Sequence, residues 1–226
     1  MTLQNNVIRT KIPGYSVTQE MFNSISHFIG IPLYLLICGL GMYFFSNGQI
    51  RLLDFFGYFI FAVSALIVYF VSGIYHLTPK DSPKKKNLRI LDHCTIYLLI
   101  AGTYTPVCFH LMREGSPIHL GIIMLSIEWI GVIVGFILNA FFFQSKASRI
   151  ISFILYVVMG WLALICGAIF QIYLYSAVLI LAGGIVYTIG SILYACGHGW
   201  KWFHFIFHLF VLAGTITQAI GIFLLH

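Results

Sequence analysis

The sequence predicts an all-α integral membrane protein, a seven-transmembrane helix bundle. Of its 226 residues, 60% are hydrophobic and only 8% are charged. A water-soluble domain could not cover its surface with so few charged side chains. The apolar residues form runs of about 20, the length that a helix needs to cross a hydrocarbon layer of about 30 Å.

Seven apolar segments follow a polar start, so we expect a cytoplasmic tail over residues 1–20 and a single membrane domain over residues 21–226. The segments are Met21–Phe45, Leu53–His76, Ile90–Leu111, Ile118–Phe143, Ile150–Gln171, Ser176–Cys196 and Phe203–Leu225. Short polar stretches separate them, and the longest of these, Thr78–Arg89, contains proline and lysine. The boundary after the fifth segment is the weakest, because only Gln171 and tyrosines interrupt the apolar run there.

The basic residues predict the orientation of these segments. With seven spans, ten of the twelve Lys and Arg fall on one side, namely Arg9, Lys11, Lys80, Lys84, Lys85, Lys86, Arg89, Lys146, Arg149 and Lys201. Cytoplasmic loops are enriched in Lys and Arg, so we expect the N-terminus in the cytoplasm and the C-terminus outside. This topology also explains the net charge of +6, and we expect no nucleic-acid partner.

Four titratable residues fall at the cytoplasmic ends of three segments: His76, Asp92, His204 and His208. Ionisable groups at such depths are costly and usually mark a functional site. His204 and His208 are four residues apart, so they share one helix face and could bind one ion. The alternative is that such a histidine pair only forms hydrogen bonds between membrane helices. Three imidazoles and a carboxylate at one depth favour a zinc site.

Further polar residues lie close to this group. Ser72 precedes His76 by about one helical turn. From there it could contact a substrate or hydrogen-bond to a metal-binding side chain. Asp92 could bind the metal directly or deprotonate a water on it. Asn23 and His27 share a face of the first segment and could orient Asp92 or a substrate; a capped helix end with an interfacial histidine is the alternative.

Several motifs resemble the bacterial hemolysin III branch of the progestin and adipoQ receptor family, from about Tyr15 to the C-terminus. They are Asn23-Ser-Ile-Ser26-His27, Ser72-Gly-Ile-Tyr-His76, Leu91-Asp92-His93, Ala101-Gly-Thr-Tyr-Thr-Pro106 and Phe203-His204-Phe-Ile-Phe-His208-Leu-Phe. The wider superfamily includes adiponectin receptors and alkaline ceramidases. The resemblance implies zinc on His76, His204 and His208, contacted by Asp92 through water and accompanied by Ser72. Ser26 stands where the family pattern leads us to expect threonine.

Two classes of function fit this resemblance, both for a multi-pass protein of a bacterial cell membrane. In the first, the protein is a hydrolase that acts on a lipid amide or ester through a zinc-activated water, with Asp92 accepting the proton and Ser72 steadying the water or the oxyanion. In the second, zinc only joins helices of a receptor, a transporter or a pore-forming cytolysin. Membrane lipid is the expected partner in either case, and the sequence does not indicate an oligomeric state.

Overall fold

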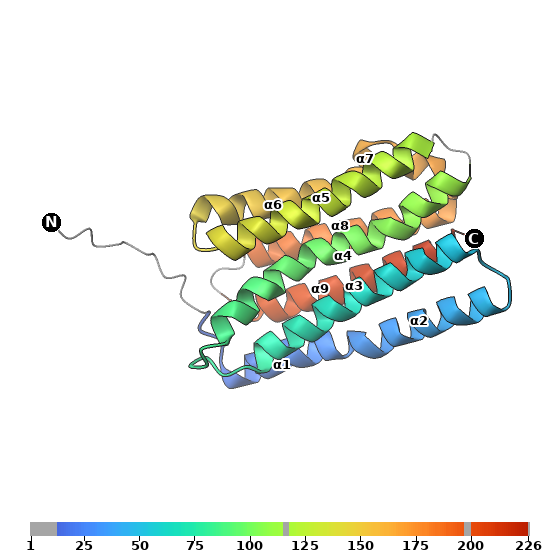
Figure 1. Ribbon diagram of the computed structural model, residues 1–226. Helices are drawn as coiled ribbons and strands as arrows, with labels where there is room; N and C mark the ends of the chain where they lie inside the picture. The colour runs from blue at the N-terminus through green and yellow to red at the C-terminus, as the bar shows by residue number, and fades with distance from the viewer. Residues whose placement is uncertain (1–12, 115–117, 197–199, 226) are drawn as a thin grey trace.

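The computed structural model describes residues 13–114, 118–196 and 200–225, and all regular structure in that part of the chain is helical (Figure 1). The part of the expected tail at residues 1–12, with Arg9 and Lys11, lies outside the described residues. The helices are α1 (Val17–Phe28), α2 (Gly30–Ser46), α3 (Leu52–Leu77), α4 (Lys85–Arg113), α5 (Ile118–Phe142), α6 (Lys146–Gly160), α7 (Leu162–Ile165), η1 (Ala168–Gln171), α8 (Leu174–Cys196) and α9 (Phe203–Phe223). The prediction of an all-α membrane bundle is confirmed.

The first apolar segment forms two helices and begins earlier than expected. Helix α1 starts at Val17, because Ser16 and Gln19 form a capping box with bonds of 3.2 and 2.9 Å to each other's backbone N–H. The helical run is interrupted at Ile29, between α1 and α2. Pro32 falls in the first turn of α2, where its missing N–H removes no intrahelical hydrogen bond.

The fifth apolar segment is also divided, at Trp161. Helix α6 has 15 residues and a length of about 22 Å, which is short of a hydrocarbon layer of about 30 Å. A left-handed glycine, Gly167 (φ 71°), then separates α7 from η1. Six helical stretches within the described residues are long and apolar enough to cross a membrane. The seventh crossing, which would need α6 and α7 together, stays a prediction, as does the orientation of the termini.

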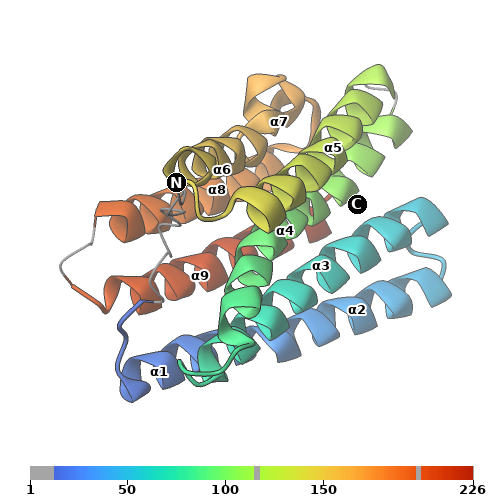
Figure 2. The same ribbon diagram turned by 60° about the vertical axis from the view of Figure 1, so that its left-hand side comes forward.

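The helices bring distant parts of the chain to one end of the bundle. Helix α1 begins, α3 ends and α9 begins at the same end, on the left of Figure 1, and Figure 2 shows the same arrangement from another side. Helix α3 packs against α1, α2 and α4, and α9 packs against α8 and α1. Because of this packing, residues near positions 20, 76 and 204 become neighbours.

The opposite end is held by a buried ion pair. The Arg113 guanidinium donates to Asp54 Oδ2 at 3.0 Å and to the Leu225 carbonyl oxygen at 3.3 Å. Its Nη2 also lies 3.0 Å from Nδ1 of the buried His110. These contacts connect α3, α4 and the end of the chain after α9, and they fix the relative heights of the helices that carry the histidines.

Candidate metal centre

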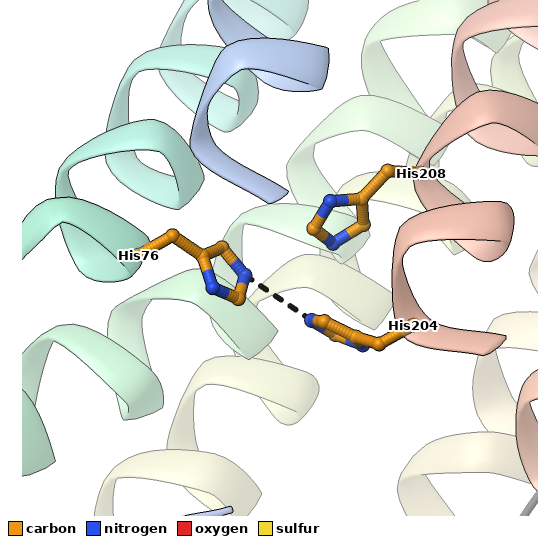
Figure 3. Close-up of side chains that lie close together, drawn as sticks. All are labelled: His76, His204 and His208. Atoms are coloured by element: carbon orange, nitrogen blue, oxygen red, sulfur yellow. Dashed lines mark hydrogen bonds between the residues drawn. The ribbon is translucent and has the colours of Figure 1, made fainter. Parts of the chain in front are cut away.

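Three imidazoles meet at the end of the bundle where α3 ends and α9 begins. His76 comes from α3, and His204 and His208 come from α9 (Figure 3). Each offers a ring nitrogen, and the three nitrogens all lie within 4.8 Å of one another. His76 Nε2 and His204 Nε2 are 3.1 Å apart. His76 and His208 are 2% and 3% exposed, whereas His204 is only partly buried.

Local sequence places each ring. Helix α3 ends just after His76 because Thr78 precedes Pro79, and a residue before proline disfavours the helical region; Thr78 has φ −69° and ψ 128°. On α9, the four-residue spacing puts His204 and His208 on one face, with ring centroids 4.4 Å apart. The last turn of one helix therefore presents one ring to the first two turns of another.

The second nitrogen of two rings is held by α1. His76 Nδ1 lies 2.5 Å from Glu20 Oε2. His208 Nδ1 lies 3.2 Å from both the Asn23 carbonyl oxygen and Ser26 Oγ. When each Nδ1–H donates to these oxygens, the lone pair of the ring is on Nε2. That nitrogen is then free to bind an ion held between the histidines. Partners of this kind set the tautomer and orientation of metal-binding histidines.

These residues fit a zinc ion. Two zinc–nitrogen bonds of about 2.0–2.1 Å at a tetrahedral angle place their nitrogens about 3.3 Å apart, close to the separation of His76 Nε2 and His204 Nε2. Without a cation, the Nε2–H of His204 can donate to the lone pair of only one of the two other rings, that of His76 or that of His208. The buried Nδ1 of His204 has no hydrogen-bond partner among the described residues. An all-imidazole set suits zinc better than magnesium or calcium. The group can therefore hold a metal ion.

Helix α1 brings Asn23 and His27 to the same place. The His27 ring lies against the His208 ring, with centroids 4.0 Å apart. Helix α1 approaches α3 closely at Gly73, where a Cβ would lie 2.6 Å from the Phe28 ring. The buried side-chain amide of Asn23 and Nδ1 of His27 have no hydrogen-bond partner within the described chain. These unpaired atoms beside the histidines are available to a water or a ligand.

Asp92 and Ser72 are near the site but outside the three-histidine group. The Asp92 carboxylate lies 3.8 Å from His93 Nδ1 and is 13% exposed. It is not among the groups whose ligand atoms meet within 4.8 Å. Ser72 is buried, one turn before His76 on α3. The prediction that Asp92 acts through water, with Ser72 beside it, remains untested by this arrangement.

The sequence reasoning missed three residues around the histidines. Glu20, assigned to the polar tail, contacts His76 and also pairs with Lys85, whose Nζ lies 3.1 Å from Glu20 Oε1. Lys85, counted with the cytoplasmic loop charges, is fully buried. The Tyr15 ring stacks on His204 with centroids 5.2 Å apart and an interplanar angle of 12°. The site therefore includes the start of α1 and the start of α4.

A spacing signal could have revealed Glu20. Glu20, Asn23 and His27 stand at positions i, i+3 and i+7, which share one face of a helix. Lys85 has no such signal, because it belongs to a run of three lysines that topology already explains.

The fold and the histidines define a polytopic helical membrane protein with a candidate metal centre at one end of its bundle. Residues 15–219 match the family model described as Haemolysin-III related. The chain is 35% identical over 210 residues to the hemolysin-3 homolog of Bacillus subtilis (strain 168), covering 90% of this chain and 92% of the relative. It is 36% identical over 214 residues to hemolysin-3 of Bacillus cereus, covering 88% of each. The chain belongs to the hemolysin III branch of the progestin and adipoQ receptor family, and it is a multi-pass protein of the bacterial cell membrane.

Proposed function

We propose that this protein is a zinc-dependent hydrolase of a lipid amide or ester. The observation that carries the proposal is the convergence of three imidazole nitrogens, one each from His76, His204 and His208, within 4.8 Å of one another. Three imidazole ligands leave one tetrahedral position open, as in catalytic zinc sites, whereas structural sites use four protein ligands. Zinc held there would act as a Lewis acid and lower the pKa of water at the open position to about 7.

In this proposal Asp92 accepts the proton. Glu20 is excluded as a free base because one of its oxygens contacts His76 and the other contacts Lys85. The Asp92 carboxylate lies 3.8 Å from His93 Nδ1, and its side chain is 13% exposed. The base in this proposal is the Asp92 carboxylate, which takes the proton of the attacking water.

The membrane setting supports a lipid as the substrate, and Ser72 is assigned a role in its cleavage. The Ser72 hydroxyl, one turn further into the bundle than His76, can donate to an oxygen on which negative charge develops. The site lies at the end of apolar helices, with the exposed side chains of the bundle mostly hydrophobic. A lipid with its amide or ester bond near the headgroup level would place that bond at the depth of the histidines.

The test is lipid turnover by purified protein together with its metal content. Protein in detergent micelles is given fluorescent ceramides and simple lipid esters, and released fatty acid is measured. We expect turnover that stops when a chelator removes zinc and returns when zinc is added. Zinc-loaded protein that cleaves no amide or ester lipid would contradict the proposal.

A second candidate, in which zinc is structural, is favoured by one observation. The histidines join α3 to α9, while Glu20 and Lys85 attach α1 and α4 to the same point. A metal at such a junction would stabilise a receptor, a transporter or a cytolysin without doing chemistry. In that case zinc removal lowers the melting temperature, no lipid is cleaved, and ion flux through liposomes separates a pore from the other two.

A further inference from the structure

The buried lysine at the start of α4 has contacts that its sequence position does not explain. Lys85 is 0% exposed, although it stands between the exposed Lys84 and Lys86. Its Nζ donates to the carbonyl oxygen of Tyr75 at 2.7 Å and lies 3.5 Å from that of His76. The ammonium group also lies 4.4 Å from the centroid of the Tyr75 ring. Lys85 therefore binds the last turn of α3, beside the histidine.

Glu20 connects this lysine to the metal centre. Its Oε1 accepts from Lys85 Nζ at 3.1 Å, while its Oε2 contacts His76 Nδ1 at 2.5 Å. The Glu20 side chain is 13% exposed and that of His76 is 0% exposed. Both carboxylate oxygens are thus engaged within the protein, and the three side chains form one chain of contacts from α4 through α1 to α3.

Burying these charges is costly unless they satisfy one another. An isolated buried ammonium or carboxylate loses its hydration, and a buried pair compensates for that loss only with good geometry and further hydrogen bonds. Lys85 has three N–H donors and three oxygen neighbours, in Glu20, Tyr75 and His76. The arrangement meets that condition, and it holds the Glu20 carboxylate at the one place where it reaches His76.

We propose that Glu20 and Lys85 are positioning residues of the metal centre: Lys85 holds the Glu20 carboxylate, and Glu20 holds the His76 ring with Nε2 toward His204 and His208. This inference rests on the metal binding in the proposed function and not on hydrolysis. Its consequence is that metal affinity depends on the docking of α1 and the start of α4 onto α3. Loss of a partner outside the ligands typically weakens metal binding 10–100-fold.

The test compares zinc affinity in four purified proteins: wild type, Glu20→Gln, Lys85→Met and the matched control Lys84→Met. Competition with a chromophoric chelator measures the zinc dissociation constant, and cobalt(II) absorption reports the ligand geometry. We expect Glu20→Gln and Lys85→Met to weaken zinc binding about 10–100-fold and to alter the cobalt spectrum. Lys84 is exposed at the neighbouring position, so Lys84→Met should match the wild type.

Two further variants keep the test decisive if a single change prevents folding. Glu20→Asp retains the charge but is one methylene shorter, so it cannot reach His76 and Lys85 together, and it should weaken zinc binding. The double variant Glu20→Gln/Lys85→Met leaves no unpaired buried charge, so its metal-free melting temperature should exceed that of Lys85→Met while its zinc affinity stays low.

Wild-type zinc affinity and an unchanged cobalt spectrum in Glu20→Gln and Lys85→Met would overturn the inference. An equal loss of zinc affinity in Lys84→Met would overturn it too, because removing any lysine of this run would then weaken zinc binding. A wild type that binds no zinc would remove this inference and the hydrolase together. Weaker zinc binding in the two variants, in a protein that cleaves no lipid, would support the positioning role and contradict only the hydrolase.

Discussion

His76 Nε2 and His204 Nε2 lie 3.1 Å apart, although 128 positions separate the two residues along the chain. The last turn of α3 and the first turn of α9 must therefore stay at one depth in the bundle. Contacts at both ends secure that depth: Glu20 and Lys85 at the histidine end, and Asp54 and Arg113 at the other. A shift of either helix by one turn, about 5.4 Å, would separate the rings.

The double change His204→Ala/His208→Ala should abolish zinc binding. It removes two of the three imidazoles and leaves His76 alone, which cannot hold the ion by itself. Metal analysis of purified protein checks the result, with near-stoichiometric zinc expected in the wild type. His119→Ala, at an exposed position of α5, is the control and should keep its zinc. Unchanged zinc content in the double variant would refute the ligand assignment.

Asp92→Asn distinguishes the two functional classes. The amide keeps the shape of the side chain but cannot accept a proton, so a catalytic Asp92 predicts turnover lower by about 10²–10⁴-fold with zinc retained. A bracing Asp92 predicts instead less zinc or a lower melting temperature. Turnover and zinc content should be measured on one preparation. Full activity with full zinc would exclude Asp92 as the base.

Arg113→Met should destabilise the fold without emptying the metal centre. It leaves the 2%-exposed Asp54 carboxylate without its guanidinium, and breaking a buried ion pair on one side costs about 3–5 kcal/mol. Thermal unfolding in detergent measures the loss. Zinc per folded protein should stay constant, because Glu20 and Lys85 still hold α1 and α4 against α3 at the histidine end. The double variant Asp54→Asn/Arg113→Met should lose less than the sum of the single changes. Additive losses would show that the two residues do not act as a pair.

Glu128→Leu should raise the melting temperature. Glu128 is 0% exposed in α5, and neither carboxyl oxygen has a hydrogen-bond partner among the described residues. Removing an unsatisfied buried polar group recovers a desolvation cost of about 1–3 kcal/mol. Glu128→Gln retains a polar group and should change stability less. A clear loss of stability in Glu128→Leu would mean that the carboxyl has a partner, such as a water.

Reporter fusions at the C-terminus should place it outside the cell, since ten of the twelve basic residues fall on the side assigned to the cytoplasm. This outcome requires an odd number of crossings, and therefore requires α6 and α7 to cross the membrane together. Alkaline phosphatase fused after α9 should be active, and green fluorescent protein fused there should be dark. The reverse pattern would mean an even number of crossings and would single out the divided α6–α7 stretch.

The sequence by itself determined the membrane class, most helix positions and the histidines. Apolar runs of about 20 residues have one stable outcome in a bilayer, because the backbone must satisfy its hydrogen bonds within each segment. The predicted segment Leu53–His76 is accordingly α3 (Leu52–Leu77). The spacing of His204 and His208 puts them on one helix face wherever the helix lies.

Only the tertiary structure decided which polar residues support those histidines. Glu20 looked like part of a polar tail and Lys85 like a loop charge, because sequence reports polarity and not neighbours. Their roles arise where α1 and the start of α4 pack onto the end of α3 and bury both groups against His76. The division of the fifth segment at Trp161 was also decided only by the tertiary structure, because the apolar run in the sequence continues through the break. Most helices follow from their local residues, whereas burial, pairing and a break inside an apolar run depend on side chains that only the folded bundle brings together.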